Sequence, residues 1–544
     1  MEVIIKFSGD FDFLLTQLSR EPSVETIEDL GQGFAVVTLA NDNVSVLNSY
    51  PVVEDIEMPK NVWLNDTSRV SSCVSAAQNE NGYGLTGQGV IVCIIDTGID
   101  YTHPDFRNSD GSTRILSFWD QTGTGQPPSG FSSGKEFTLE MLNNALFSSD
   151  PLSVTGRLDI NGHGTAVAGI AAGNGKTDPY FKGVAPMADI IAVRVKPAGD
   201  DFSRSTELMR ALKYVIYKSR EFGRPASINI SYGMNQGSHM GDSLFEEYLT
   251  SISSVWKTSI SVPTGNEGGA GHHYSGIISS NQTKNIDFFT ASGIDRFYIS
   301  IWKNFADEIA FELVTPEGKR TGWIDTADPI RDFRIGNLAI NVVYSMPTRY
   351  SVSQEIFFAI QSSAGFISAG AWQIRLRAGA IVDGQFDIWL PTVEEVTTGT
   401  YFSSPDNYLT MTIPSTARKI IRTAGYNDTL DSSAEFSGVG NIDTSMQMPD
   451  ISAPAVGIIA PRIGGGYDSF TGTSFAAPFV TGAAALMMEQ GIVRGYSPFL
   501  YGEKIKAYLR RSAIRSDNMK YPNPVSGYGR LCVSSAISEI MRNV

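Results

Sequence analysis

Four polar residues in this chain occupy positions where side chains of their type could do nucleophilic chemistry. Asp96 ends an apolar segment in CIIDTGID, His163 lies between two glycines in NGHGTAVAG, and Ser474 opens an apolar stretch in TGTSFAAP. Asn266 follows the apolar and small run SISVP, within VPTGNEGG. An acid that orients a histidine, a neutral imidazole that takes a proton and a serine that loses it would form a triad, and an amide N–H could hold an oxyanion.

Each of these residues has a simpler explanation when it is considered alone. An acid before Thr-Gly is commonly a turn or cap residue, and Gly-Asn is a common turn. A lone histidine is usually structural, although His163 alone of the five histidines has such glycine-rich surroundings. Ser474 is suited to cap a helix, with Pro478 tolerated in the first turn. Because a helix N-terminus also favours a developing negative charge, capping and attack by Ser474 are compatible.

Two other motifs point to different chemistry, and we exclude both. The Asp-Thr-Gly triplet at 96–98 also occurs in aspartic proteases, which need two such acids sharing a proton, and the sequence has no second copy in a similar context. GYGLTG at 82–87 matches G-x-G-x-x-G. It precedes a strand, whereas a dinucleotide-binding fingerprint must follow a strand and open a helix.

The segments that must position the four residues alternate between strand and helix patterns. Residues 89–95 form a short apolar run with β-branched residues, typical of a strand buried on both faces. We expect helices at 163–173 and 205–221, and strands at 189–195 and 227–233. This alternation predicts a doubly wound, mostly parallel α/β sheet with active groups at the carboxyl ends of its strands.

Two further parts of the chain have a different character. Residues 1–65 have the pattern of a β-α-β-β-α-β unit and carry 11 acidic against 3 basic residues. Between 275 and 405 the helical pattern gives way to alternating strands, which predicts an inserted antiparallel β-sandwich of jelly-roll-like form. The α/β domain would then consist of residues 66–274 and 406–544.

Composition restricts the partners and the location that we expect. The net charge of −15 and the lack of a Lys- or Arg-rich block argue against nucleic acid. The N-terminus has an early acid and no basic lead into an apolar core, unlike a signal peptide, and the longest weakly polar run, 475–488, is too short to span a membrane. Cys73, Cys93 and Cys532 form no disulfide framework or metal-ligand spacing, so we expect a cytoplasmic protein without a membrane partner.

Asp96, His163 and Ser474 occur in the chain order Asp, His, Ser that is found in subtilisin. With IIDTGIDYTHPDF, NGHGTAVAG, GVAP, SINISYG, PTGNEGG and GTSFAAP in order, the chain resembles the subtilisin-like serine protease family over about 85–270 and 405–535. The resemblance implies a serine endopeptidase in which Asp96 orients His163, His163 takes the proton of Ser474, and Ser474 Oγ attacks a peptide carbonyl to form an acyl-enzyme. Asn266 and the Ser474 backbone N–H would hold the oxyanion.

The same resemblance assigns several further roles. Ser231, Tyr232 and Gly233 look like the edge strand that pairs with an extended protein or peptide substrate. The N-terminal unit is similar to the family's prodomain, which assists folding and acts as an intramolecular inhibitor until self-cleavage, which we expect between about 60 and 70.

The insertion between Asn266 and Ser474, with this prodomain, is similar to the clostridial spore-germination proteases. That group implies packaging into spores. It also includes members with decayed triads, so the alternative is a catalytically silent binding or regulatory partner in germination. Here the triad residues and Asn266 are all present, while APA at 454–456 and Phe475 depart from the commoner residues of the family.

Compact secreted relatives bind calcium partly through an acid that matches Asp105, near the loop after the histidine helix. In this chain that loop reads NGKTDPYFK, and its lysines disfavour a cation. We therefore expect no structural calcium, no other metal and no cofactor.

Overall fold

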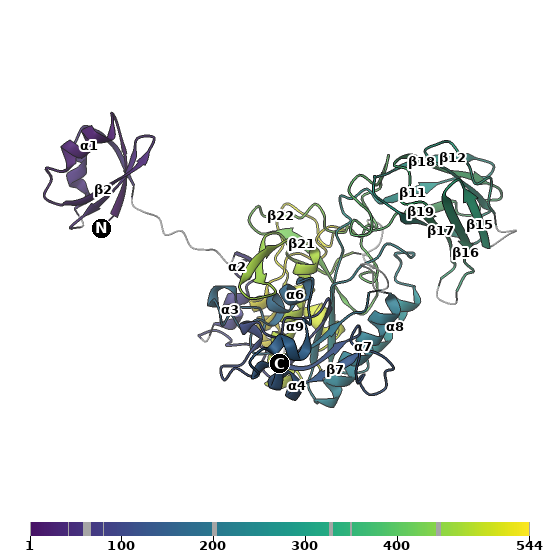
Figure 1. Cartoon of the computed structure of the whole chain (residues 1–544), viewed down its shortest axis with the longest axis horizontal. Coiled ribbons are helices and arrows are strands. Elements are labelled where there is room, and N and C mark those ends of the chain that lie inside the picture. The colour runs from purple at the N-terminus through teal and green to yellow at the C-terminus, as the bar shows by residue number, and fades with distance from the viewer. Residues whose placement is uncertain are drawn as a thin grey trace. The chain divides into compact units, whose positions relative to one another are not determined.

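A mostly parallel sheet carries Asp96 at the carboxyl end of its strand β5 (Ile91–Asp96). The sheet has the strand order β22-β21-β10-β9-β5-β8-β6-β7, and β23 also pairs with β21. The computed structural model describes residues 2–41, 43–57, 67–79, 81–197, 204–325, 330–348, 351–441 and 448–542. The chain divides into two compact units, Met1–Asn65 and Asp66–Val544 (Figure 1).

The pairs β6–β7 and β21–β22 are antiparallel, and the other pairs of this sheet are parallel. The sheet thus has the expected doubly wound α/β pattern. Its remaining strands are β6 (Ile115–Asp120), β7 (Lys135–Thr138), β8 (Asp189–Arg194), β9 (Ala226–Ile230), β10 (Thr258–Pro263), β21 (Ile421–Asn427), β22 (Ser432–Ser433) and β23 (Ile451–Pro454).

Strand β5 is buried on both faces, as its uninterrupted apolar sequence indicates. Val92 and Ile94 belong to the core shared with α6 and α9, whereas Cys93 and Ile95 belong to the core shared with α7 and α8. Helices α6 (His163–Ala172) and α9 (Thr473–Met488) lie side by side in Figure 1 and pack against each other. The two helices that begin at the predicted base and nucleophile therefore share one face of the sheet.

The remaining helices complete the body. They are α2 (Thr67–Ser71), α3 (Val74–Gln78), α4 (Leu139–Leu146), α5 (Pro151–Thr155), α7 (Ser205–Glu221), α8 (Leu244–Ile252), α10 (Glu503–Ser512) and α11 (Val533–Arg542), with 3-10 turns η2 (Pro104–Phe106) and η3 (Pro179–Phe181). A hairpin of β24 (Ile458–Pro461) and β25 (Tyr467–Phe470) precedes α9.

Helix α9 is longer than its apolar run suggests. It continues through the π-helical turn η5 (Glu489–Val493), so the helical segment spans Thr473–Val493, long and apolar enough by composition to cross a membrane. The apolar run at 475–488 is therefore part of a longer helical segment. The most apolar window is 89% buried within the body, as is usual for the core helix of a soluble protein.

The N-terminal unit has the expected order of elements. Its antiparallel sheet has the order β2-β3-β1-β4, with a core that includes Val3, Ile5 and Leu14. The second helix is a 3-10 turn of six residues rather than an α-helix. The elements are β1 (Glu2–Phe7), α1 (Phe11–Leu18), β2 (Val24–Gly31), β3 (Phe34–Leu39), η1 (Val44–Ser49) and β4 (Val53–Glu57).

The inserted part consists of two antiparallel sheets that enclose a core of their own, as the alternating pattern predicts. The larger sheet has the order β11-β19-β13-β17-β16-β15 and the smaller β14-β18-β12-β20. Their strands are β11 (His273–Ile277), β12 (Thr283–Thr290), β13 (Arg296–Asn304), β14 (Ile309–Val314), β15 (Ile330–Ile335), β16 (Leu338–Tyr344), β17 (Ser353–Ser362), β18 (Gly370–Ala378), β19 (Gln385–Trp389) and β20 (Tyr401–Phe402).

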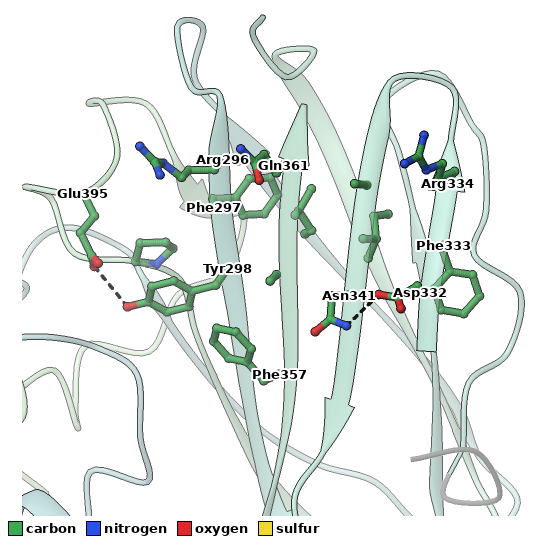
Figure 2. Close-up of a pocket in the computed structure, with 15 residues that line it drawn as sticks. Arg296, Phe297, Tyr298, Asp332, Phe333, Arg334, Asn341, Phe357, Gln361 and Glu395 are labelled. Carbon is green, nitrogen blue, oxygen red and sulfur yellow. Dashed lines mark hydrogen bonds between the residues drawn. The ribbon is translucent and has the colours of Figure 1, made fainter. Parts of the chain in front are cut away.

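A cavity of about 730 Å³ lies on the larger sheet of the sandwich (Figure 2). Tyr298 and Phe357 line it from neighbouring strands, and Pro391 and Glu395 line it from the loop that follows β19. The phenol of Tyr298 donates to the carboxylate of Glu395 at 3.1 Å. The loop is therefore fixed to the sheet at this cavity.

The cysteines depart from the expectation of unpaired thiols. Cys73 and Cys532 form a disulfide with their Cα atoms 4.9 Å apart, although 459 residues separate them in sequence. Packing of α11 against α3, with a hydrogen bond from the Val533 N–H to the Ser72 carbonyl, brings these positions together. Cys93 is a buried thiol, and burial raises its pKa to about 12.

We expect replacement of Cys532 by Ser to destabilise the oxidised protein by about 2–4 kcal/mol, because the cross-link restricts the unfolded chain. The measurement is the urea midpoint of wild type and variant, with and without dithiothreitol. The two proteins should differ without the reductant and coincide with it. Non-reducing peptide maps that lack a 73–532 linked pair would contradict the pairing.

Candidate active site

Asp96 and His163 form a direct contact at the carboxyl end of β5. His163 Nδ1 lies 2.7 Å from Asp96 Oδ1, which also accepts a hydrogen bond from the Thr97 N–H at 2.7 Å. The Asp96 side chain is 1% exposed and that of His163 is 26% exposed. A buried carboxylate thus fixes one ring nitrogen, which leaves Nε2 free to exchange a proton with a substrate-facing group.

The start of α6 is held to the end of β5 by a carboxylate outside the predicted set. Asp159 Oδ1 accepts from the Gly162 N–H at 2.9 Å and the Thr97 hydroxyl at 3.0 Å. Its Oδ2 accepts from the N–H and hydroxyl of Thr165, at 3.0 and 2.6 Å. Asp159 therefore fixes both the strand end and the helix that carry Asp96 and His163.

Two glycines allow this close approach of helix and strand. A Cβ at Gly164 would lie 2.2 Å from the carbonyl oxygen of Gly98 and 3.1 Å from the Asp96 side chain. Gly162, the residue before α6, has φ +90°, which L side chains rarely adopt. The glycines around His163 thus set its distance from Asp96.

The start of α9 rules out the role of Ser474 as a helix cap. Gly472 is the N-cap residue, so Ser474 is the second residue of the helix, and Pro478 lies in the second turn rather than the first. Because Pro478 has no N–H, the carbonyl of Ser474 loses its usual partner four residues on. The hydroxyl of Ser231 donates to that carbonyl at 3.2 Å.

Phe475, the residue after Ser474, packs against His163. The ring of Phe475 packs with its centroid 5.1 Å from that of the His163 imidazole. The described hydrogen bonds of His163 run to Asn161 and Asp96, and none of them reaches the Ser474 hydroxyl. Such catalytic hydrogen bonds are commonly long in enzymes without substrate and tighten when substrate binds.

The side-chain amide of Asn266 is hydrogen-bonded to the first residue of α9. Its Oδ1 accepts from the N–H and the hydroxyl of Thr473, both at 3.1 Å, so its Nδ2 must point the other way. Nδ2 donates to the carboxylate of Glu394 at 3.0 Å. The donor expected to hold an oxyanion is therefore oriented by the helix that carries Ser474, and it has an anionic partner from the sandwich.

The segment expected to pair with substrate directly follows β9. Ser231 is buried against the carbonyl of Ser474, and its hydroxyl also accepts from Asn229 Nδ2 at 2.8 Å. Residues 231–233 lie outside the strand itself, which ends at Ile230, so the expected strand at 227–233 is shorter. Tyr232 is half-buried and Gly233 is exposed.

Comparison with known proteins agrees with this geometry. The family model described as Subtilase family matches residues 87–298 and 387–530, most of the chain and both parts of the α/β body. The chain belongs to the subtilase family. A second model, Csp protease B prodomain, matches residues 1–60 of this subtilase. The break between the two matched ranges of the first model lies within the sandwich.

A solved structure and two curated proteins show the range of the likeness. The Clostridium perfringens CspB protease is 34% identical with a TM-score of 0.80, over 88% of this chain and 98% of that one. The PII-type proteinase of Lacticaseibacillus paracasei and the minor extracellular protease Vpr of Bacillus subtilis are both 23% identical, over 97% and 95% of this chain. This subtilase spans only 30% and 59% of their respective lengths.

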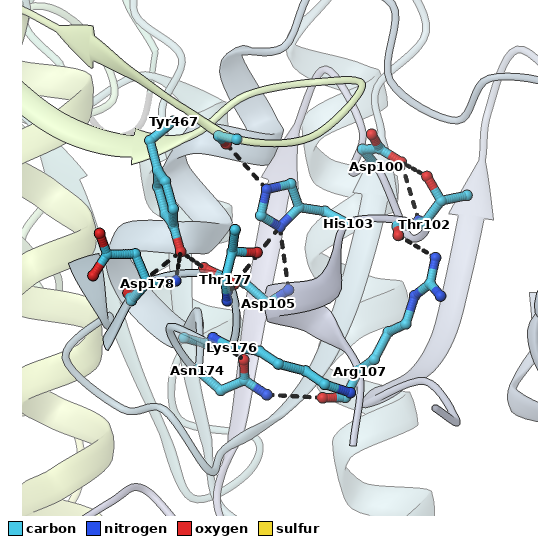
Figure 3. A network of polar contacts seen from close by, with 12 residues as sticks. Asp100, Thr102, His103, Asp105, Arg107, Asn174, Lys176, Thr177, Asp178 and Tyr467 are labelled. Atoms are coloured by element: carbon cyan, nitrogen blue, oxygen red, sulfur yellow. Dashed lines mark hydrogen bonds and ion pairs between the residues drawn. The ribbon is translucent and has the colours of Figure 1, made fainter. Parts of the chain in front are cut away.

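Asp105, the acid that matches a calcium ligand of compact relatives, accepts hydrogen bonds from protein donors (Figure 3). Asp105 is buried, and it accepts from the Thr177 N–H at 3.2 Å and the Tyr467 hydroxyl at 2.8 Å. Lys176 Nζ donates to the carbonyl of Asn108 at 2.9 Å. Within the described ranges no cluster of His, Cys, Asp or Glu is arranged to hold a metal. The donors on Asp105 support the absence of calcium, which stays a prediction.

Two residues of the site, Asp159 and Glu394, were not predicted from the sequence, for different reasons. Asp159 has a local signal, because an acid in the turn before a helix, as in DINGHGT, commonly accepts from the first free N–H groups. Glu394 has no such signal, since it lies 128 residues beyond Asn266 in a loop of the inserted sandwich.

The charges around His163 raise its pKa. Burial works to lower the pKa, but the charge of Asp96 and its hydrogen bond outweigh burial, and Asp159 and Glu394 add smaller effects in the same direction. We expect His163 to act as the base and therefore to be neutral, so activity should appear only as pH rises through this elevated pKa.

Replacing Asp96 by Asn is expected to move the acid limb of the kcat/KM profile to lower pH, because the charge that raises the pKa of His163 is removed. The rate should also fall by about four orders of magnitude, the size of this effect in a Ser-His-Asp triad. Profiles of wild type and Asp96→Asn, measured on one peptide, check both effects. An unchanged acid limb would show that Asp96 does not act on the base.

Proposed function

We propose that this subtilase is a serine endopeptidase whose catalytic triad is Asp96, His163 and Ser474. The observation that carries the proposal is the hydrogen bond from His163 Nδ1 to the buried Asp96, next to the helix start that contains Ser474. A histidine oriented in this way can serve as base toward a serine at a helix N-terminus.

The reaction follows from the roles of the individual atoms. His163 Nε2 takes the proton of the Ser474 hydroxyl as Oγ bonds to the peptide carbonyl carbon, and the oxyanion forms toward Asn266 Nδ2 and the Ser474 N–H. His163 then gives the proton to the leaving amine as the C–N bond breaks. Water, deprotonated by His163, releases the acyl group and restores Ser474. Asp96 stabilises the imidazolium in both steps.

Residues 231–233 would bind the substrate backbone. Their position directly after β9, with Ser231 bonded to Ser474, supports pairing with an extended peptide that passes Ser474. Protein or peptide chains are therefore the substrate class.

The unit Met1–Asn65 would act as inhibitory prodomain of a self-cleaving zymogen, which its match to the Csp protease B prodomain supports. The expected junction at about 60–70 lies mostly outside the described residues. A binding partner without activity is the alternative, and the same experiment separates the two.

Ser474→Ala should abolish both labelling by a fluorophosphonate probe and self-cleavage, because both need Oγ. Wild type should migrate as two fragments and the variant as one, and mass spectrometry of the mature N-terminus gives the junction. Absence of labelling in wild type that has lost its prodomain would overturn the proposal in favour of the silent partner. Cleavage of the alanine variant at the same bond would assign processing to another protease.

Asn266→Ala should lower kcat by roughly a hundred- to a thousandfold, the effect of losing the corresponding donor in subtilisin. KM should change much less, because the hydrogen bond strengthens in the transition state. Steady-state kinetics on enzyme quantified by probe labelling separate the two constants. A loss of less than tenfold would show that Asn266 does not hold the oxyanion.

A further inference from the structure

A carboxylate of the inserted sandwich accepts a hydrogen bond from the side-chain N–H that we expect to hold the oxyanion. Glu394 Oε1 accepts from Asn266 Nδ2 at 3.0 Å, while Asn266 Oδ1 is bound to Thr473. Because Thr473 fixes the orientation of the amide, Nδ2 is the only part of it that can serve an oxyanion. Glu394 and the oxyanion therefore compete for one donor.

The loop that carries Glu394 is anchored on both sides of this residue. Before it, the Val393 N–H donates to Glu267 Oε1 at 2.8 Å, and Glu267 is held by His272 Nδ1 at 2.7 Å and Asn235 Nδ2 at 3.0 Å. Glu267 directly follows Asn266, so the loop and the donor share one support.

After Glu394, the half-buried carboxylate of Glu395 closes the loop. It accepts from the Thr392 N–H at 2.9 Å and from the Tyr298 hydroxyl at 3.1 Å, at the edge of the cavity in Figure 2. Burial raises the pKa of Glu395, and its hydrogen bonds oppose this effect. The loop on both sides of Glu394 is thus held in place, while the Glu394 side chain itself is exposed.

The described partner of the Glu394 carboxylate is an amide and not a cation. Among the residues described, Glu394 forms no ion pair, and its side chain is exposed. The titratable groups around the loop and the site include Asp96, Asp159, His163, Glu267, His272, Glu395 and Tyr298. A negative oxyanion next to this carboxylate would be repelled, whereas a cation brought by the substrate would pair with the carboxylate and draw it from Asn266.

We propose that Glu394 determines specificity: it competes with the oxyanion for Asn266 Nδ2 and selects substrates that carry Lys or Arg beside the scissile bond. The cation of such a substrate pairs with Glu394 and frees the amide. When the substrate carries a neutral or acidic residue beside the scissile bond, Glu394 stays bound to Asn266 Nδ2. This proposal rests on the proposed peptidase function.

The test compares internally quenched peptides built on the chain's own cleavage junction, with Arg, Gln or Glu placed in turn on each side of the scissile bond. Wild type should cleave the better Arg peptide at least tenfold faster, in kcat/KM, than its Gln counterpart. In Glu394→Gln this ratio should fall to within about twofold, and kcat on the Gln peptide should rise. Glu394→Ala should behave in the same way.

Glu317→Gln is the matched control, because it removes an exposed carboxylate of the same sandwich that is hydrogen-bonded to Thr315 and Ser368. It should keep the wild-type ratio. The acid limb of the pH profile should move slightly down in both Glu394 variants and stay in place in Glu317→Gln, since only the Glu394 variants lose a negative charge near His163.

Two failures are distinguishable when every enzyme is first quantified with the fluorophosphonate probe. If wild type is labelled but shows no preference for a basic residue, or if Glu394→Gln keeps the preference, the role of Glu394 is overturned and the peptidase function stands. If wild type without its prodomain is not labelled, the peptidase function fails and this proposal fails with it.

Discussion

The hydrogen bond between His163 Nδ1 and the buried Asp96 carboxylate is the interaction on which the site depends. It needs a carboxylate at the exact end of a buried strand, which explains why β5 is apolar up to Ile95 and polar at Asp96. It also needs α6 to approach the strand end more closely than a side chain at position 164 would allow. Gly164 meets this need, because a Cβ there would clash with the carbonyl of Gly98. Asp159 then fixes the two elements with hydrogen bonds to Thr97 and Thr165.

The N-terminus of α9 has a structural role and a proposed chemical role. The free N–H groups of a helix N-terminus stabilise negative charge, but they must be left available at Ser474. Asn266 takes the N–H of Thr473, so the next N–H remains for an oxyanion. Pro478 removes a partner from the carbonyl of Ser474, and Ser231, in the segment after β9, supplies another. The proposed nucleophile, Ser474, is therefore tied to Asn266 and to the segment after β9.

The inserted sandwich reaches the site by a short loop. Glu395 binds this loop to Tyr298 on the larger sheet, and Glu267 binds it to the segment of Asn266. Loops on a rigid scaffold commonly carry function. An insertion with a core of its own can thus place a single carboxylate against Asn266 Nδ2 while the α/β body keeps its own packing.

The sequence by itself determined the elements and the family. Alternating strand and helix patterns and an apolar run ending in Asp96 are local properties, and so are the glycines around His163, because hydrophobic periodicity and φ restrictions act over a few residues. Contacts between distant segments could not be read in this way.

Only the tertiary structure paired Cys73 with Cys532 and brought Glu394 to Asn266. It also showed that Gly472, and not Ser474, is the N-cap residue of α9. The physical reason is that each of these depends on how helices and loops pack around the sheet. A hydrogen bond between residues 128 positions apart leaves no trace in the composition or the spacing of either segment.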